Sequence, residues 1–359
     1  MHHKTPTVAV VDPSSSVLPF DYYFCQSLLS KGFRVTVFAS ETSYNPEFLA
    51  ELKNDNRVEV RLWRVSSTVA GRILGTLEYA ALLFSLIVAS RRFERIYYNF
   101  PQVYLLEFLV FAISRSRLVY CVHNAVPHGH PSSRHWGTHL LAANAKRLLF
   151  LSRWAKHDFL DRYGLGYDRV SSVLQHGVMA INPQHKLCRY RATPYFSGVA
   201  FWGNIKPYKG IELFRLNPGA WLPERVEKRY VIAGKWDRQL DELKSQYSTR
   251  DDIDLLEGFL APAEVERLVK TDLVFVLPYK QASQSGVLYT LLFYGRYFIA
   301  TDRGDVGDFL RLNNLSELII ADFSENELRR AISWLVENLD YVRERLNHAQ
   351  DTYTWKYST

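Results

Sequence analysis

The stretch Phe201-Trp-Gly-Asn-Ile-Lys-Pro-Tyr-Lys-Gly210 decides the fold class, together with a second stretch, Leu277-Pro-Tyr-Lys-Gln-Ala-Ser-Gln-Ser-Gly-Val287. Each reads as a short apolar strand, a turn that contains glycine, and the start of a helix. In α/β proteins such turns hold phosphate, because free backbone N–H groups and the positive end of the helix face the anion. Two such turns in one domain indicate a ligand that carries a diphosphate, such as a nucleotide-sugar.

Short apolar runs alternate with helical patterns on both sides of these turns, which is typical of parallel sheets with right-handed crossovers. In the first half, strands are predicted at residues 7–11, 33–38, 58–63, 96–98, 117–122, 147–151 and 170–174. In the second half, strands are predicted at residues 199–202, 229–233, 253–256, 273–277, 297–301 and 318–321. Helices are predicted at residues 20–29, 68–90, 288–294 and 325–349.

The length of 359 residues favours two domains, because single cores stop growing before that size. Residues 1–182 form the first predicted domain, and the irregular residues 183–198 read as a linker. Residues 199–340 form the second domain, and residues 341–359 are expected to pack back on the first. The default ligand site is the cleft between two doubly wound domains, at the carboxyl ends of their strands.

The composition is that of a folded globular protein, with 47% hydrophobic and 23% charged residues. The net charge of +7 suits anionic partners such as phosphates or an acidic membrane surface. No zinc-ligand spacing or long basic helix is present in the sequence, so nucleic acid is not an expected partner. The three cysteines are widely separated and the first residues lack a signal-peptide pattern, so we expect a reducing, cytoplasmic location.

Two segments are unusually apolar, residues 79–89 and 103–113, and Arg91-Arg92 follows the first. The run at residues 79–89 is too short to span a bilayer. Core helices are the usual explanation. The alternative is a helix with an exposed face that sits on an anionic bilayer, which would place the protein peripherally on the inner face of the cytoplasmic membrane.

Several segments in order resemble GT-B-fold glycosyltransferases, and the bacterial family 4-like (group 1) set that builds surface polysaccharides in particular. The resemblance rests on the first helix and three loops of the first half and on four segments of the second half: Pro19–Gly32, Val122–His128, Leu149–Ser152, Gln175–Val178, Trp202–Gly210, Leu256–Leu260 with Leu277–Tyr279, Gln284–Val287 and Ala300–Gly304. The resemblance implies two Rossmann-like domains that face each other across a cleft. It also implies that the first domain binds the acceptor and the second binds the nucleotide-sugar.

Three positions depart from the family's pattern. Many members carry an arginine where Asn204 stands, and Lys206 is the nearest cation here. Many members also carry two glutamates seven residues apart, at positions that correspond to about Ser283 and Leu291. The second of these glutamates normally binds the ribose hydroxyls, so ribose recognition in this chain needs another explanation.

The donor site is predicted from the two turns and from the resemblance. Transfer of a sugar requires stabilisation of the departing diphosphate, and a lysine aimed at that charge is suited to the task. Lys209 is therefore the first candidate, and backbone N–H groups of residues 285–287 are expected to face the phosphates. The predicted donor-binding residues are Gly203, Asn204, Lys206, Lys209, Leu260, Tyr279, Gln281, Gln284, Ser285, Gly286 and Val287.

The acceptor side is predicted from a histidine-rich loop after a buried strand. His123 and His128 lie in this loop, with Asn124 between them. An imidazole there can bond sugar hydroxyls or act as a base, and His123 is a catalytic candidate with Lys209. Asn124 and His128 are expected to bind the acceptor. If the reaction inverts configuration, Asp21 is the carboxylate candidate for the base, although a charge at a helix N-terminus is the plainer reading of this residue.

The predicted function is transfer of a hexose from a nucleotide-diphosphate sugar, UDP more than GDP, to a growing saccharide or polyprenyl-linked acceptor. No metal site or cofactor is expected: Asp252-Ile-Asp254 precedes a strand rather than following one, and no dinucleotide or Walker loop is present in the sequence. Two alternatives remain open. One is an inactive GT-B-fold subunit that only binds nucleotide or saccharide, and the other is a sugar-nucleotide epimerase.

Overall fold

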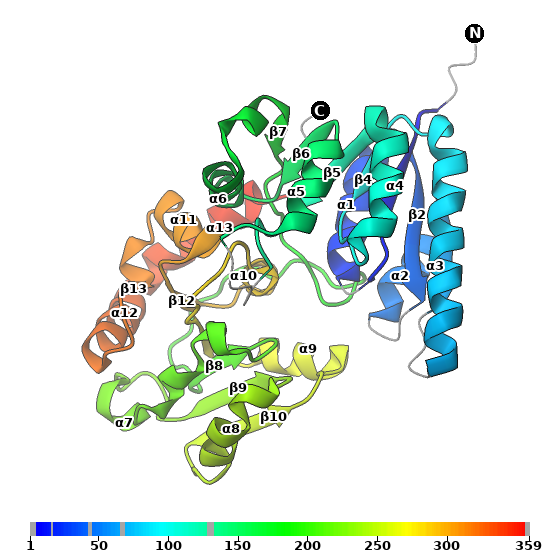
Figure 1. Ribbon diagram of the computed structural model, residues 1–359. Coiled ribbons are helices and arrows are strands. Elements are labelled where there is room, and N and C mark those ends of the chain that lie inside the picture. The colour runs from blue at the N-terminus through cyan, green and yellow to red at the C-terminus, as the bar shows by residue number, and fades with distance from the viewer. Residues whose placement is uncertain (1–4, 16, 42–44, 65–68, 128–132, 356–359) are drawn as a thin grey trace. The chain divides into compact units, whose positions relative to one another are not determined.

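The computed structural model describes residues 5–15, 17–41, 45–64, 69–127 and 133–355 (Figure 1). The chain divides into two compact units, which are treated separately here. The first unit runs from Met1 to His176 and includes the end of the chain from Trp355. The second unit runs from Gly177 to Thr354.

The first unit is a parallel sheet with helices in the crossovers. Its described strands are β1 (Thr7–Asp12), β2 (Arg34–Glu41), β3 (Val58–Arg64), β4 (Ile96–Tyr98), β5 (Leu118–Val122), β6 (Arg147–Phe150) and β7 (Ser171–Val173). They lie in the order β3-β2-β1-β4-β5-β6-β7. The described helices are α1 (Leu18–Ser30), α2 (Pro46–Asn54), α3 (Val69–Ala89), α4 (Tyr104–Ser114), α5 (Trp136–Asn144) and α6 (Arg153–Tyr163).

The core of this unit follows from its sequence pattern. β1 is buried along nearly its whole length, as expected for a strand covered by helices on both faces. One face of α3 packs into the core through Tyr79, Leu83 and Leu86, and α4 contacts α3 beside it. The hydroxyl of Tyr79 donates to the buried carboxyl of Glu107 on α4, which links the two helices.

The second unit repeats the plan with a smaller sheet. Its described strands are β8 (Val199–Trp202), β9 (Tyr230–Gly234), β10 (Ile253–Glu257), β11 (Val274–Leu277), β12 (Phe298–Thr301) and β13 (Ile319–Ile320), all parallel, in the order β10-β9-β8-β11-β12-β13. Its described helices are α7 (Pro218–Trp221), α8 (Asp241–Ser248), α9 (Pro262–Lys270), α10 (Gly286–Phe293), α11 (Gly304–Leu312), α12 (Glu325–Glu337) and α13 (Leu339–Thr352).

The predicted α/β fold with two doubly wound domains is confirmed, and every predicted strand is present within a few residues. The predicted helix at residues 325–349 is wrong in one respect, because it is interrupted. α12 ends at Asn338, whose side-chain amide donates to the carbonyl of Trp334.

The chain's last segment also differs from the prediction for residues 341–359. α13 packs in the second unit, where the Gln350 side chain donates to the carbonyl of Leu292 at 2.6 Å and Leu346 is fully buried. Only the residues from Trp355 onward belong to the first unit. Trp355 packs there against Phe20 and His176, with ring centroids 5.4 and 5.0 Å away.

Candidate functional site

Each sheet has one point where the strand order reverses, and the candidate residues gather there. In the second unit, β8 and β11 are neighbours, and the chain leaves them toward opposite sides of the sheet. Loops that leave such strands at their carboxyl ends frame the usual binding crevice of an open α/β sheet. The loop after β8 spans residues 203–210, and the loop after β11 spans residues 278–285.

These two loops are fastened to each other. The backbone N–H of Lys280 donates to the carbonyl of Tyr208 at 2.9 Å, and the Lys280 ammonium pairs with the Glu212 carboxylate. Gly210 adopts a left-handed φ of 69°, and a Cβ there would lie only 1.8 Å from the carbonyl oxygen of Pro278. Only glycine permits this approach, so the predicted glycine turn is a packing requirement of the site.

Lys209 lies where the loops meet. Its Nζ is 3.5 Å from the ring centroid of Tyr279, which is buried, and the Tyr279 hydroxyl lies 3.2 Å from the Oγ of Ser285. Burial lowers the pKa of Lys209 to about 8, Asp305 opposes this shift and Lys206 adds to it. A cation stripped of water and held against a π face interacts strongly with an incoming anion.

The start of α10 supplies a second anion-binding feature. Ser285 is the N-cap, and its Oγ accepts from the N–H of Leu288 at 3.3 Å. Gly286 is exposed in this first turn, where helix N–H groups lack partners within the helix. Gly203 of the other loop faces this turn, because a Cβ on it would lie 3.4 Å from a methyl group of Val287. Lys209, Tyr279 and Ser285 therefore form one chain of contacts, and Gly203 lies against Val287 at the start of the same helix.

The remaining predicted donor residues differ in their exposure to solvent. Asn204, Lys206 and Gln281 are exposed, and Gln284 is half-buried on the loop before α10. Leu260 is buried on the loop after β10. Tyr279 is 1% exposed, so it positions Lys209 and Ser285 rather than offering its own surface to a sugar.

Asp305, at the start of α11, was missed by the sequence analysis. Its side chain is 3% exposed, and the Tyr289 hydroxyl donates to its Oδ2 at 3.1 Å. Burial raises the pKa of Asp305 to about 7, while hydrogen bonds from Tyr289 and the Ser285 backbone and the charge of Lys209 act in the opposite direction. The preceding Gly304 has a φ of 60° and packs on the carbonyl of Ala282, which brings this carboxyl against the loop before α10. The Gly304-Asp305 pair, which directly follows the predicted strand at residues 297–301 and its turn, was the only signal for it in the sequence.

The first unit places a carboxyl pair at its own reversal point, between β1 and β4. Asp12 ends β1, and Asn99 follows β4 and donates to Asp21 of α1 at 2.8 Å. Burial, and then the neighbouring Asp12 charge, raise the pKa of Asp21 well above its usual range. Burial also raises the pKa of Asp12. Asp21, the predicted carboxylate base, is 1% exposed, and its raised pKa favours the protonated form, which disfavours that role.

His123 directly follows β5 at the same edge of the sheet. Its ring stacks on Phe100 with centroids 3.8 Å apart, and Phe20 meets it edge-on. Burial, with a smaller contribution from His176, lowers the pKa of His123 to about 3. The imidazole is therefore neutral at physiological pH, and it suits hydrogen bonding more than a role that requires a positive charge. Asn124 is half-buried beside it, and His128 lies outside the described residues.

Metal ligands do not cluster in the part of the chain that the structure describes: no group of three or more His, Cys, Asp or Glu side chains lies close enough to hold an ion. Asp252 of the Asp-x-Asp sequence is occupied by Arg250, whose guanidinium donates to both carboxylate oxygens. Asp254 pairs with Arg229.

Comparison with known proteins bears on the family and the fold. Residues 197–338 match the family described as Glycosyl transferases group 1. A comparison with curated proteins gave no match. Anabaena Alr3699/HepE, solved in complex with UDP and glucose, is similar with a TM-score of 0.68 and 16% identity, over 98% of this chain and 96% of that chain.

Two further solved structures show the same likeness. WaaG, a glycosyltransferase involved in lipopolysaccharide biosynthesis, has a TM-score of 0.62 and 15% identity, over 97% of each chain. Sucrose-phosphate synthase from Thermosynechococcus elongatus has a TM-score of 0.64 and 14% identity, over 97% of this chain and 95% of that chain. The chain has the GT-B fold of these glycosyltransferases, and its residues 197–338 belong to the glycosyl transferases group 1 family.

Proposed function

We propose that this protein transfers a sugar from a nucleotide-diphosphate sugar to a saccharide or lipid-linked acceptor. The observation that carries the proposal is the group at the β8–β11 reversal point. There the half-buried ammonium of Lys209 lies over the ring of Tyr279, whose hydroxyl contacts Ser285, the N-cap of α10. Both features bind anions, and a diphosphate is the anion whose two phosphates match two such features.

The chemistry follows from where charge develops. A bond forms between an acceptor oxygen and the anomeric carbon of the sugar, the bond from that carbon to the diphosphate breaks, and the nucleoside diphosphate leaves. Lys209 and the N–H groups of Gly286 and Val287 stabilise the negative charge that grows on the leaving phosphate, whereas the Ser285 N–H, which was also predicted to do so, donates to Asp305. Since these groups meet the charge directly, we propose that no metal ion or other cofactor takes part.

The acceptor is assigned to the first unit. Neutral His123 and the neighbouring Asn124 present groups that hydrogen-bond sugar hydroxyls. The acceptor's proton goes to His123 if configuration is inverted, or to the departing phosphate if it is retained. The stereochemical course stays open between these two.

We propose UDP rather than GDP as the leaving nucleotide and a surface or exopolysaccharide, such as a capsule, as the product. The support for UDP is the likeness to HepE, whose structure holds UDP and glucose. The support for the product class is WaaG, described as acting in lipopolysaccharide biosynthesis. A bacterial, cytoplasmic enzyme at the inner face of the membrane fits this role.

The first experiment is a thermal shift of the full chain with UDP-, GDP- and dTDP-sugars, beside Lys209→Ala and the control Lys270→Ala. Lys270 is an exposed lysine of the same unit whose partner is Glu266 on its own helix. A ligand at about 100 times its Kd adds about 2.7 kcal/mol to the free energy of unfolding. We expect a shift with UDP-sugars that Lys209→Ala loses and Lys270→Ala keeps. A shift that both variants keep would contradict the assigned site.

The same samples separate the proposed enzyme from its two rivals. Release of free UDP from the selected sugar, lost in Lys209→Ala, supports transfer or its hydrolytic side reaction. Binding without UDP release, with or without a saccharide acceptor, would instead indicate a non-catalytic subunit. Conversion of the sugar without release would indicate an epimerase.

We also propose that the enzyme lies on an anionic membrane through α3 and α4. These neighbouring helices expose large apolar side chains along one side each, namely Leu74, Leu77, Phe84 and Val88 on α3 and Leu105, Leu109 and Ile113 on α4. Among the described residues one helical segment, Leu74–Arg92, is long and apolar enough to cross a membrane, a test that core helices also pass. Since the other side of α3 is core, a helix lying in the interface fits better than one that spans.

A further inference from the structure

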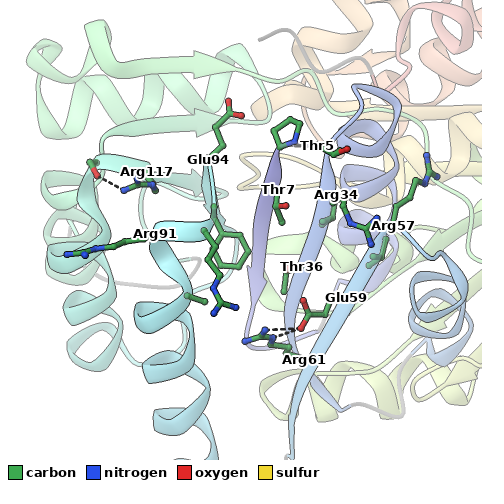
Figure 2. Close-up of a pocket in the computed structure, with 17 residues that line it drawn as sticks. Thr5, Thr7, Arg34, Thr36, Arg57, Glu59, Arg61, Arg91, Glu94 and Arg117 are labelled. Atoms are coloured by element: carbon green, nitrogen blue, oxygen red, sulfur yellow. Dashed lines mark hydrogen bonds and ion pairs between the residues drawn. The ribbon is translucent and has the colours of Figure 1, made fainter. Parts of the chain in front are cut away.

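A wide cavity lies at the amino-terminal ends of the strands of the first sheet, whereas the candidate residues of this unit lie at the carboxyl ends. It has a volume of about 1220 Å³ and is framed by the amino-terminal ends of β1 to β5 and by the carboxyl end of α3. Figure 2 shows Thr7 near its centre, with Arg91 and Arg117 on one side and Arg34 and Arg57 on the other. Asp12 and His123 belong to the carboxyl ends of the same strands. The cavity is therefore separate from the proposed catalytic residues.

The lining of this cavity is strongly basic. It contains two glutamates, Glu59 and Glu94, and six arginines: Arg34, Arg57, Arg61, Arg91, Arg92 and Arg117. So many like charges around one hollow repel each other, which costs free energy unless an anion offsets the repulsion. We call these residues the arginine pocket.

Partners within the protein account for only part of this charge. Arg57 pairs with Asp55, and Arg61 pairs with Glu59. Arg34 donates to a backbone carbonyl, which leaves its charge uncompensated. Across the described ranges, Arg91 and Arg92 have neither an ion pair nor a side-chain hydrogen bond. Arg91 and Arg92 are also exposed, so both are free to bind a ligand.

A simpler explanation covers some of these arginines. Arg91 and Arg92 follow the carboxyl end of α3, and Arg117 follows α4, where positive charge is favourable to the helix dipole. The helix dipole does not explain Arg34 and Arg57 at the starts of β2 and β3. It also does not explain why the pocket adjoins the ends of the two helices with the exposed apolar sides.

We infer that the arginine pocket binds the phosphate headgroup of an anionic phospholipid. This inference rests on the membrane part of the proposed function. Arg91 and Arg92 end the same helix that exposes Phe84 and Val88, so one lipid surface meets both apolar and basic groups. The net charge of +7 complements a negative bilayer. The apolar sides supply insertion, and the pocket supplies selection for negatively charged headgroups.

The test is sedimentation of the full chain with vesicles of phosphatidylcholine alone and of phosphatidylcholine mixed with phosphatidylglycerol. The test variant is Arg91→Glu/Arg92→Glu. The control is Arg215→Glu/Arg267→Glu, which makes the same charge change on exposed arginines of the second unit. A third variant, Phe84→Ser/Leu109→Ser, tests the apolar sides. We expect the wild type to prefer the mixed vesicles, and the test variant to bind them about 30-fold less tightly while the control stays near wild type.

The outcomes separate the inference from the proposal beneath it. Equal weakening by the test and control variants means a general charge effect and overturns the pocket. Binding that depends on Phe84 and Leu109 but not on Arg91 and Arg92 also overturns the pocket, and leaves the membrane proposal standing. Absence of binding to both vesicles overturns both. Inorganic phosphate is then added to the vesicle-bound protein, beside chloride at the same ionic strength. Release by phosphate but not by chloride would identify the phosphate group itself as the ligand.

Discussion

The reversal points of the two sheets have the same topology and opposite electrostatics. At β8–β11 the structure holds a desolvated cation, Lys209, and open helix N–H groups. At β1–β4 it holds a buried carboxyl, Asp21, whose pKa is raised well above its usual range, and a neutral histidine, His123. Topology therefore fixes where a doubly wound sheet binds its ligand, and the buried side chains decide which ligand. In the proposed function, the second unit binds the diphosphate and the first binds uncharged hydroxyls.

The largest effect is expected for Lys209→Ala. Removal of one group that stabilises developing charge typically costs about 10²–10³ in kcat. We expect a loss of this size in steady-state transfer measured with the sugar donor chosen by thermal shift, while Lys270→Ala stays within about threefold. A rise in KM with kcat unchanged would show that Lys209 binds the donor equally in the ground and transition states.

Gly210→Ala tests whether the two loops must touch. The new methyl group would lie 1.8 Å from the Pro278 carbonyl, in a left-handed conformation, so the loops must separate. We expect the free energy of unfolding to fall by about 2–4 kcal/mol in urea denaturation, and nucleotide binding to be lost. Gly166→Ala is the control, because that glycine has open space around it and no left-handed φ. Equal effects of the two substitutions would contradict the packing argument.

Asp305→Asn tests the missed carboxyl through pH. The folded pKa of Asp305 is raised from 3.8 to about 7, so its ionisation destabilises the fold as pH rises from about 4 through 7. The amide keeps an acceptor for Tyr289 and carries no charge. We therefore expect the variant to gain on the order of 2 kcal/mol in stability at pH 8 and little at pH 4, by thermal melts.

Asp251→Asn is the matched control, since this aspartate is exposed. A gain for Asp305→Asn that is equal at both pH values would show that charge is not the cause.

The smallest effect on rate is expected for Asp21→Asn. An essential general base contributes about 10²–10⁴ to a rate, but a carboxyl that stays protonated cannot act as one. The amide also keeps an oxygen that accepts from Asn99. We expect kcat to change by less than about threefold, with His123→Ala measured beside it as the stronger candidate. A hundredfold loss of kcat in Asp21→Asn would contradict the difference described between the two reversal points.

Much of the fold was predictable because buried parallel strands read as short apolar runs. The runs at residues 7–11 and 297–301 became β1 and β12, and the order of motifs gave the GT-B fold. The break at Asn338 was not predictable, because Asn338 lies inside an otherwise continuous helical pattern. The unit boundary at His176 was also missed, since the chain stays apolar through residue 181 and only contacts show where packing changes.

The candidate site was predictable at positions where the backbone conformation restricts the residue type. Gly210 is such a position because a left-handed turn favours glycine, and Ser285 is another because a helix N-cap favours serine. The roles of Tyr279 and Asp305 were not readable, because burial and neighbours far away in the sequence create them. The arginine pocket has the same origin: its arginines are scattered from Arg34 to Arg117 and meet only through the parallel register of the strands.

The central claim is that the diphosphate binds at the loops of residues 203–210 and 278–287. Amide hydrogen exchange of the full chain with and without saturating UDP tests it most directly, because exchange reports each backbone segment separately. The account predicts slower exchange in both loops and in the first turn of α10, and no such slowing in Lys209→Ala at the same UDP concentration. Protection confined to the loops after β1 and β5, with residues 203–210 and 278–287 unchanged, would contradict it.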